Sequence, residues 1–452
     1  MKKKVLILGA GLVANPIVNY LLEKGFELTV ATAPETIDRA RVMIANRPNG
    51  KAVEWTMNHK EALDELIVSH DLTVSLLPWA FHVEVAGHCI KHKKDMVTTS
   101  YVKPDMQALD QKARDAGILI LNELGADPGM DHMSAKRIID HVHDKGGKVK
   151  KFYSFCGALP APEAADNPFR YKFSWSPKGV LLASNNDGRY LCNGEEVYVP
   201  GNDIFKDPIP VEVPEIGKLD VYPNRNSLPY IDKYGIPEVQ TIMRGTFRHP
   251  GWCETLDVIK KLNLITNDNY DMTGKTYADL MRMLVGAGES DDIREKVAAH
   301  AGLPEDAHPI QALEWLGLFE DKPMNRRQDT PFEVVSDLMI EKMILGTHER
   351  DMVVMQHLLL AAYPDGQKEV IRSCMLDYGS KATDTAIART VTLPAAVAVE
   401  MILKGEICEK GVQIPVFPAI YNPILEALEA MGIKMDECYG LPEREMVQTG
   451  GE

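Results

Sequence analysis

VLILGAGLVA, at residues 5–14, is a short apolar run that ends in two closely spaced glycines. The apolar run predicts a buried strand, and the G-x-G-x-x-A pattern directly after it predicts a tight turn that opens a helix. Gly9 permits the turn, Gly11 lets the backbone approach a pyrophosphate, and Ala14 lets the helix pack closely on the strand. The N-terminus of that helix favours the phosphate charge. We therefore expect a dinucleotide-binding fold to begin here.

Strand and helix signals alternate regularly through the first 126 residues. Short apolar runs bounded by glycine, proline or polar residues predict strands, and helix-spaced segments separate them. This alternation is typical of a Rossmann α/β fold, a doubly wound parallel sheet with helices on both faces. The expected strands lie at residues 5–8, 27–31, 52–56, 72–77, 96–99 and 118–121.

The alternation stops after Gly125, and the remaining chain predicts a second α/β unit. We expect residues 127–255 and 345–391 to form a mixed sheet with long loops, and residues 256–344 to form a helical insertion within it. Part of residues 392–452 is expected to complete the first sheet. The chain would then comprise three parts, which suits its length.

Local signals in the second half are specific at three places. Residues 352–363 and 368–375 flank Pro364-Asp365-Gly366 and predict a long β-hairpin. Thr330-Pro331-Phe332-Glu333 predicts a capping box with proline in the first helical turn. Residues 394–403 predict a helix that ends at Gly405.

Composition excludes several classes of function. The 452 residues carry 50 Lys+Arg against 65 Asp+Glu, a formal net charge of −15, so we expect no nucleic-acid partner. No apolar stretch of about 18 residues is apparent, and no membrane-spanning helix is expected. The seven cysteines are odd in number and never spaced CxxC, which disfavours a disulfide framework and a cysteine metal site. A reducing, cytoplasmic location is the simplest expectation.

The end of the second expected strand bears on the choice of cofactor. Folds that bind NAD usually place Asp or Glu there to hold the ribose hydroxyls. This chain has Thr32-Ala33-Pro34, and Glu35 is the first carboxylate that follows. A missing carboxylate removes repulsion of a 2′-phosphate, and Arg39 and Arg41 lie a short way along the chain. The sequence leaves NAD and NADP open, with a slight preference for NADP.

Acidic and histidine residues follow the sixth expected strand, where a nicotinamide ring would lie. Asp127, Asp131 and His132 resemble metal ligands, but no further spaced ligand completes the set, so we expect no metal. Asp127 precedes Pro128-Gly129, which favours an N-cap role for this carboxylate.

Arginines beside glycine, proline and aromatic residues recur in the second unit of this acidic protein. They fall in the segments YPNR at residues 222–225 and RGTFRHPGW at residues 244–252. Because the planar guanidinium matches the geometry of a carboxylate, these segments predict carboxylate capture.

Ten short motifs, each present once, are spread along nearly the whole chain. They are GxGxVAxP (residues 9–16), SL[LI]PxxFH (75–82), TSY (99–101), NExGxDPGxDH (122–132), CGxLPAPE (156–163), DNPxxYKFSWS (166–176), YPNR (222–225), RGTxR (244–248), WLG (315–317) and ERDMV (349–353). Together they resemble the glutamate-forming saccharopine dehydrogenases, also called saccharopine reductases. The central motifs are long and specific.

This resemblance implies an enzyme with three parts. A Rossmann domain binds the nucleotide, a mixed α/β domain binds substrate and helps to form a homodimer, and a helical domain is inserted in the second. The family interconverts L-saccharopine with L-glutamate and L-2-aminoadipate-6-semialdehyde in lysine metabolism, by hydride transfer with NAD(P). Relatives that use NADP often carry arginine where this chain has Ala33, which weakens the transfer of cofactor preference.

The glycine pattern and the resemblance together give the expected site residues. Cofactor contacts are expected from Gly9, Gly11, Leu12, Val13, Ala14, Thr32, Ala33, Leu76 and Thr99. Substrate contacts are expected from Ser100, Tyr101, Asp127, Lys172, Arg225, Arg244, Thr246 and Phe247. The catalytic candidates are Asp127, Tyr101 and Cys156.

Saccharopine is a secondary amine with three carboxylates. The amine must lose its proton before a hydride leaves the neighbouring carbon, and water must then be activated against an imine. The sequence does not choose the base among the three catalytic candidates. Arg225 is the first choice for a substrate carboxylate, with Lys172, Arg244 and Arg248 behind it.

Two other functions stay open at this stage. One is a related dehydrogenase of another amino-acid-derived imine, such as a carboxynorspermidine or lysine dehydrogenase, which should lack the segments at residues 166–176 and 222–225. The other is a non-catalytic dinucleotide-binding regulatory protein, because a fold does not fix a function.

Overall fold

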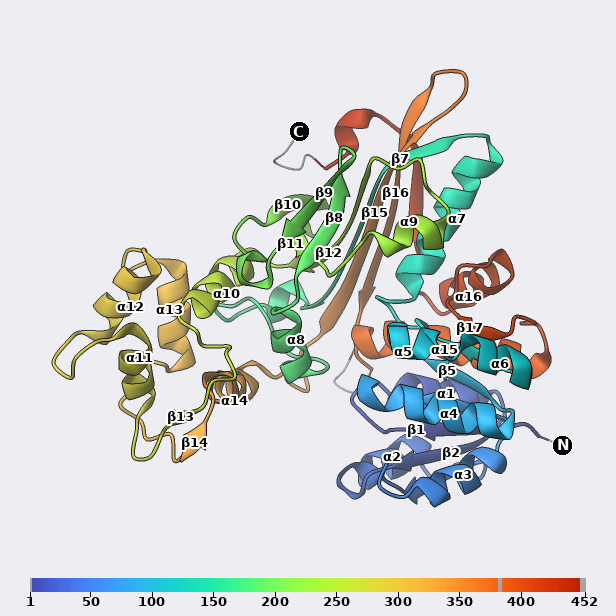
Figure 1. Cartoon of the computed structure of the whole chain (residues 1–452), viewed down its shortest axis with the longest axis horizontal. Helices are drawn as coiled ribbons and strands as arrows, with labels where there is room; N and C mark the ends of the chain where they lie inside the picture. Colours follow the sequence, from blue (N-terminus) through green and yellow to red (C-terminus); the bar gives the residue numbers. More distant parts are fainter. Residues whose placement is uncertain (1, 381–383, 448–452) are drawn as a thin grey trace.

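The structure, a computed structural model, describes residues 2–380 and 384–447. A seven-stranded parallel sheet occupies its N-terminal part (Figure 1), which confirms the predicted α/β class. The strand order is β17-β6-β5-β4-β1-β2-β3. The strands are β1 (Lys4–Leu8), β2 (Glu27–Thr32), β3 (Gly50–Glu54), β4 (Leu72–Ser75), β5 (Asp95–Thr98), β6 (Leu119–Leu121) and β17 (Gly411–Gln413).

Alternation of side chains along β1 explains why helices cover both faces of this sheet. Val5 and Ile7 pack into one core with helices α1, α2, α15 and α16, while Leu6 and Leu8 pack into another with α3 to α6. These helices are α1 (Asn15–Glu23), α2 (Ile37–Ile44), α3 (Lys60–Val68), α4 (His82–His92), α5 (Pro104–Gln107), α6 (Asp110–Ala116), α15 (Ala386–Lys404) and α16 (Pro418–Ala430).

A nine-stranded mixed sheet forms the second layer of the molecule. Its main order is β10-β11-β12-β7-β15-β16-β18, with β8 paired to β12 and β9 paired to β8. The predicted hairpin is confirmed as β15 and β16, which run antiparallel with Met355 opposite Met375. The strands are β7 (Lys148–Pro160), β8 (Gly188–Cys192), β9 (Glu195–Val199), β10 (Ile209–Val213), β11 (Gly217–Pro223), β12 (Thr241–Arg248), β15 (Asp351–Ala362), β16 (Lys368–Tyr378) and β18 (Asp436–Leu441).

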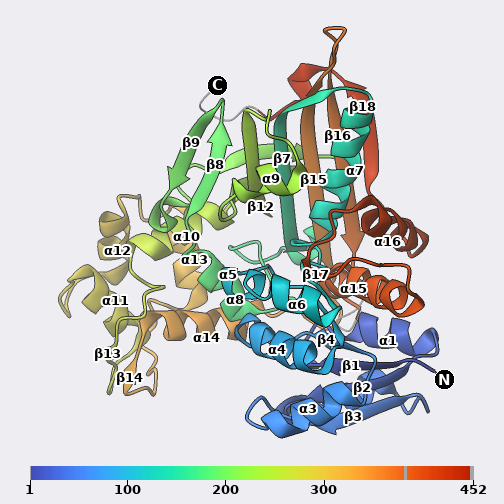
Figure 2. The same ribbon diagram turned by 45° about the vertical axis from the view of Figure 1, so that its right-hand side comes forward.

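Helices flank this sheet and extend beyond it. Helices α7 (Met130–Asp144) and α9 (Pro229–Tyr234) lie along one side of the sheet, and α8 (Pro177–Ala183) lies near the N-terminal part (Figure 2). A helical lobe projects away from both sheets, with the two-stranded pair β13 (Tyr270–Asp271) and β14 (Gln328–Asp329) at its lower edge in Figure 1. The helices of this lobe are α10 (Trp252–Lys261), α11 (Tyr277–Val285), α12 (Ile293–Ala301), α13 (His308–Leu316) and α14 (Pro331–Met343).

The predicted capping box at the start of α14 is only half formed. The Thr330 hydroxyl accepts the amide N–H of Glu333, as expected. The Glu333 carboxylate, however, pairs with Lys178 of α8 instead of returning to the Thr330 amide. Lys178 therefore binds the Glu333 carboxylate that a complete capping box would pair with the Thr330 amide.

Helix α15 corrects two expectations. It begins at Ala386, capped by the Thr385 hydroxyl, so Pro394 lies inside it and not at its start. Tertiary packing outweighs the penalty of an internal proline, because the helix is buried along most of its length against α1 and β15. It is also long and apolar enough to cross a membrane by length and composition, contrary to our expectation, but 83% of its most apolar window is buried inside the protein.

Candidate active site

A cavity of about 350 Å³ lies where the two sheets approach each other, beside α8 and α15. Figure 2 shows α15 between the two sheets. The N-terminal part contributes residues that follow its β-strands, and the mixed sheet contributes strand residues and the loop after β11. The lining includes Val13, Thr99, Tyr101, Ala126, Asp127, Cys156, Gly157, Ala158, Trp175, Val180, Asn186, Tyr222, Asn224, Arg225, Thr246, Arg248, Ile387 and Val391.

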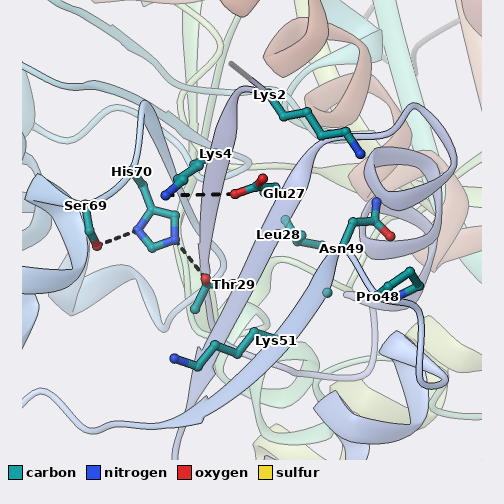
Figure 3. A pocket seen from close by; sticks show the side chains of 11 residues that line it. Lys2, Lys4, Glu27, Leu28, Thr29, Pro48, Asn49, Lys51, Ser69 and His70 are labelled. Atoms are coloured by element: carbon teal, nitrogen blue, oxygen red, sulfur yellow. Dashed lines mark hydrogen bonds and ion pairs between the residues drawn. The ribbon is translucent and has the colours of Figure 1, made fainter.

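A second hollow, of about 420 Å³, lies at the amino ends of β1, β2 and β3. Lys2, Lys4, Lys51 and His70 surround it, and His70 bonds to the Thr29 hydroxyl at 2.8 Å (Figure 3). Parallel α/β sheets bind ligands at the carboxyl ends of their strands, which is the opposite edge. We therefore place the active site in the cavity between the sheets.

Tyr101 and Asp127 form the polar centre of the cavity wall, and Arg244 lies behind them. The Tyr101 hydroxyl donates to Asp127 Oδ1 at 2.6 Å. Arg244 Nη2 donates to the same oxygen at 2.5 Å and lies 3.3 Å from the Tyr101 hydroxyl. The Arg225 guanidinium lies 5.5 Å from the centre of the Tyr101 ring, on the solvent side. A carboxylate is thus held in place by two donors and faces a cavity that is also lined by the exposed Arg225.

Burial sets the proton affinities of these groups. It raises the pKa of the Asp127 carboxyl above its ordinary value, although Arg244 opposes that rise. It also raises the pKa of the Tyr101 hydroxyl and of the Cys156 thiol well above their ordinary values. Tyr101 and Cys156 therefore stay protonated at neutral pH, while Asp127 becomes a stronger base than an ordinary carboxylate.

A fully buried network stands behind Asp127. Arg244 Nη2 also donates to Asp131 Oδ2 at 2.7 Å, and that oxygen lies 3.3 Å from His132 Nδ1. His132 Nε2 lies 2.6 Å from Glu123 Oε2. Burial would raise the pKa of Glu123, but its hydrogen bond and ion pair with His132 lower it to about 2. The arginine is thereby fixed by carboxylates on both sides and is not free to move into the cavity.

The structure contradicts the N-cap role of Asp127. Helix α7 begins at Met130, and the carboxylate that accepts the Gly129 amide N–H is Asp131, at 2.6 Å. Asp127 turns instead towards Tyr101 and Arg244. Among residues 2–380 and 384–447, no group of three His, Cys, Asp or Glu side chains is arranged to hold a metal ion.

The glycine turn has the shape that a dinucleotide needs. Gly9 has φ +104°, and a Cβ there would lie 3.0 Å from the Leu76 carbonyl oxygen, so only glycine fits between the ends of β1 and β4. A Cβ on Gly11 would meet no atom within 4 Å, which leaves room above the start of α1 for a phosphate. The Ala10 amide donates to the Thr32 hydroxyl at 3.2 Å and ties the turn to the end of β2.

The other expected cofactor residues lie along the same edge. Val13 and Thr99 line the cavity, whereas Leu12 is half exposed and Ala14 is buried under α1. Ala33 directly follows β2 and is partly exposed. The residues of this set thus follow the carboxyl ends of β1, β2, β4 and β5, where the two ends of a dinucleotide would bind.

The expected substrate residues divide into two groups. Four of them, Tyr101, Asp127, Arg225 and Thr246, lie in the cavity wall, together with the catalytic candidate Cys156 and with Arg248. Arg244 lies behind the wall, and Ser100 is held by His82 Nε2 at 2.8 Å. Phe247 points away and packs edge-on against Phe155. The expectation for Lys172 is wrong: it does not line the cavity, and its ammonium is paired with Asp166 and Glu349.

Five cavity residues were not predicted from the sequence, and two of them, Val180 and Ala183, belong to α8. Ile387 and Val391 belong to the first half of α15, which was expected to begin only at Pro394. Asn186 follows α8 in a loop without any motif. A threonine directly before an apolar run, Thr385, was the available signal for the earlier start of α15.

Comparison with known proteins agrees with this geometry. Residues 5–121 match the saccharopine dehydrogenase NADP binding domain, and residues 125–433 match the saccharopine dehydrogenase C-terminal domain. The chain belongs to the saccharopine dehydrogenase family.

Individual relatives match over their full length. The chain is 36% identical to the saccharopine dehydrogenase [NADP(+), L-glutamate-forming] of Pyricularia oryzae, covering 96% of this chain and 98% of the relative. It is 35% identical to the protein of the same name from Saccharomyces cerevisiae, covering 97% and 99%. The apo structure of a histidine-tagged saccharopine dehydrogenase (L-Glu forming) from the same yeast superimposes with a TM-score of 0.87 at 34% identity, covering 97% of this chain and 99% of that one.

Proposed function

We propose that this chain is an NADP-dependent, glutamate-forming saccharopine dehydrogenase that interconverts L-saccharopine with L-glutamate and L-2-aminoadipate-6-semialdehyde. The observation that carries the proposal is Asp127, a buried carboxylate of raised pKa that is held by Tyr101 and Arg244 beside Val13 and Thr99. The full-length relatives that bear this activity in their names support it. When bound, NADP accepts a hydride from the carbon beside the secondary amine of saccharopine and leaves an imine that water hydrolyses.

Asp127 is the base in this proposal. It takes the proton from the substrate amine, so that the nitrogen lone pair is free to form the imine, and passes that proton on to solvent. The carboxylate then accepts a proton from the water that attacks the imine and returns it to the nitrogen of the departing glutamate. A carboxylate of raised pKa is a better base in both steps than an ordinary carboxylate, because its pKa lies closer to neutral pH. Tyr101 and Cys156 keep their protons and therefore act as hydrogen-bond donors.

Arginine side chains at the mouth and floor of the cavity recognise the substrate carboxylates. Arg225 is exposed and forms none of the ion pairs of the described chain, so its guanidinium is free to bind a carboxylate. Arg248 is buried against the rings of Tyr171, Tyr222 and Trp252, and its Nε has no hydrogen-bond partner among the described residues. A substrate with three carboxylates would satisfy both cations inside a protein of net charge −15.

Apolar side chains close the rest of the cavity. Val180, Ile387 and Val391 contribute branched aliphatic groups, and Trp175 contributes a ring whose Nε1 has no partner among the described residues. Such a lining excludes bulk water from the imine until one positioned molecule attacks.

We further propose a homodimeric, cytoplasmic enzyme. The resemblance to the family supports the dimer. All seven cysteines lie in the described part of the chain and none forms a disulfide, which supports a reducing compartment.

Absorbance in the reduced-nicotinamide band tests the function with the purified chain. L-Saccharopine with NADP should give a steady rise, and the same substrate with NAD a much slower one. A rise with L-lysine or carboxynorspermidine, together with none from saccharopine, would overturn the substrate. Binding of NADP without turnover of any of the three would favour a regulatory protein.

A further inference from the structure

We propose that Arg39 binds the 2′-phosphate of NADP and sets the cofactor preference of this chain. The inference rests on the NADP dependence in the proposed function. It assigns recognition of the 2′-phosphate to a residue that lies beyond the end of β2. Position 33 directly follows β2, where a dinucleotide fold holds the adenine ribose, and here it carries an alanine. Neither a carboxylate for NAD nor an arginine for NADP is present at that position.

Arg39 and Arg41 are the two arginines near this point, and the structure separates them. They lie two residues apart on α2, so their side chains leave the helix in different directions. Arg41 is engaged in two ion pairs, with Asp38 at 2.8 Å and with Glu54 of β3 at 3.8 Å. Its charge is already matched by carboxylates of the protein.

Arg39 instead reaches across the end of β2 to the glycine turn. Its Nη1 lies 3.5 Å from the carbonyl oxygen of Ala10, which is the residue between Gly9 and Gly11. Within residues 2–380 and 384–447 no carboxylate lies within ion-pair distance of this guanidinium, and the side chain is exposed. The cation therefore spans the gap between the turn expected to hold the pyrophosphate and the strand end expected to hold the ribose.

The segment beneath Arg39 is held firmly. Thr32 Oγ1 accepts the Ala10 amide at 3.2 Å and lies 2.6 Å from Thr36 Oγ1. Thr36 also bonds through its amide to the Ala33 carbonyl oxygen at 3.0 Å. These bonds tie the glycine turn, the end of β2 and the start of α2 together, so the backbone from which Arg39 extends is held in place before the cofactor binds.

Direct binding distinguishes this role from a general effect on charge. We would titrate the full-length protein with NADPH and with NADH, without saccharopine, and follow nicotinamide fluorescence. Arg39→Ala should weaken NADPH binding by about 10-fold or more, the order expected for one charge-assisted contact to a phosphate, and change NADH binding less than about 2-fold. Arg41→Ala is the matched control and should leave both affinities within about 2-fold of the parent.

Ligands without a nicotinamide test the contact to the 2′-phosphate separately. Adenosine 2′,5′-bisphosphate should compete with NADPH more strongly than 5′-AMP for the parent protein, and Arg39→Ala or Arg39→Gln should erase most of that difference. Equal losses for NADPH and NADH, an unchanged NADPH affinity, or the same loss in Arg41→Ala would each overturn the assignment. Because no turnover is measured, a wrong choice of amino-acid substrate would leave these results unaffected.

Discussion

Replacing Asp127 by asparagine removes the proposed base and keeps the shape of the site. The amide oxygen still accepts the Tyr101 hydroxyl, and Arg244 keeps its bond of 2.7 Å to Asp131, so no buried cation is left alone. Substrate binding, which depends on Arg225 and Arg248 in this account, should be nearly intact. The loss should therefore appear in kcat and not in KM.

The size of the loss follows from the role. General-base catalysis typically contributes about 10²–10⁴-fold, so kcat for saccharopine oxidation should fall by that factor in Asp127→Asn, or roughly 2.7–5.4 kcal/mol of transition-state stabilisation. The parent rate should fall as the pH drops through the raised pKa of Asp127, because the protonated carboxyl cannot accept the amine proton. The variant should lack that acidic limb.

Steady-state rates with NADP across the pH range give both quantities in one experiment. Asp115→Asn, an exposed carboxylate of α6, is the control and should behave as the parent. A variant that keeps more than a third of the parent kcat, or that keeps the acidic limb, would refute the assignment of the base.

Three further substitutions test other parts of the structure. Arg225→Ala should raise the KM for saccharopine at least about 10-fold, since a charged hydrogen bond is worth about 1.5–3 kcal/mol, and unchanged kinetics would remove Arg225 from the site. Gly129→Ala should cost at least about 2 kcal/mol in urea unfolding, because its Cβ would lie 2.2 Å from the Gly125 carbonyl oxygen, whereas Gly235→Ala, with open space around it, should cost about 1 kcal/mol; equal costs would contradict this. Glu123→Gln should lose about 2–3 kcal/mol of stability at pH 7, because the folded pKa of Glu123 is lowered from 4.5 to about 2. The gap between parent and variant should shrink as the pH falls from about 4.5 towards 2, and a gap that does not change with pH would show that the carboxylate is not the stabilising group.

The parts of the fold that depend on a local sequence pattern could be predicted from the sequence. The β1 strand, the glycine turn and the hairpin of β15 and β16 each carry a local pattern that does not depend on distant residues. The start of α15 could not be predicted, because an internal proline is unfavourable in an isolated helix and only burial against α1 and β15 stabilises it. The partner of Glu333 depends likewise on where α8 comes to lie.

The site shows the same division. Tyr101 and Asp127 follow strands and the arginine segments have a distinctive composition, so their presence near a ligand could be expected from sequence. The pairing of charges could not, because Arg244 meets Asp127 and Asp131 across more than a hundred residues. The sequence could not show either that Lys172 pairs with Glu349, which lies far from it along the chain, and so Lys172 was expected to bind substrate.

Product analysis is the most direct test of the central claim. The purified chain would be given L-saccharopine and NADP, and the products would be quantified as the reaction proceeds. We expect one L-glutamate and one aldehyde for each NADPH formed, with no L-lysine. Formation of NADPH with L-lysine and 2-oxoglutarate in place of glutamate would show that the other carbon–nitrogen bond is cleaved, and would contradict the proposed function.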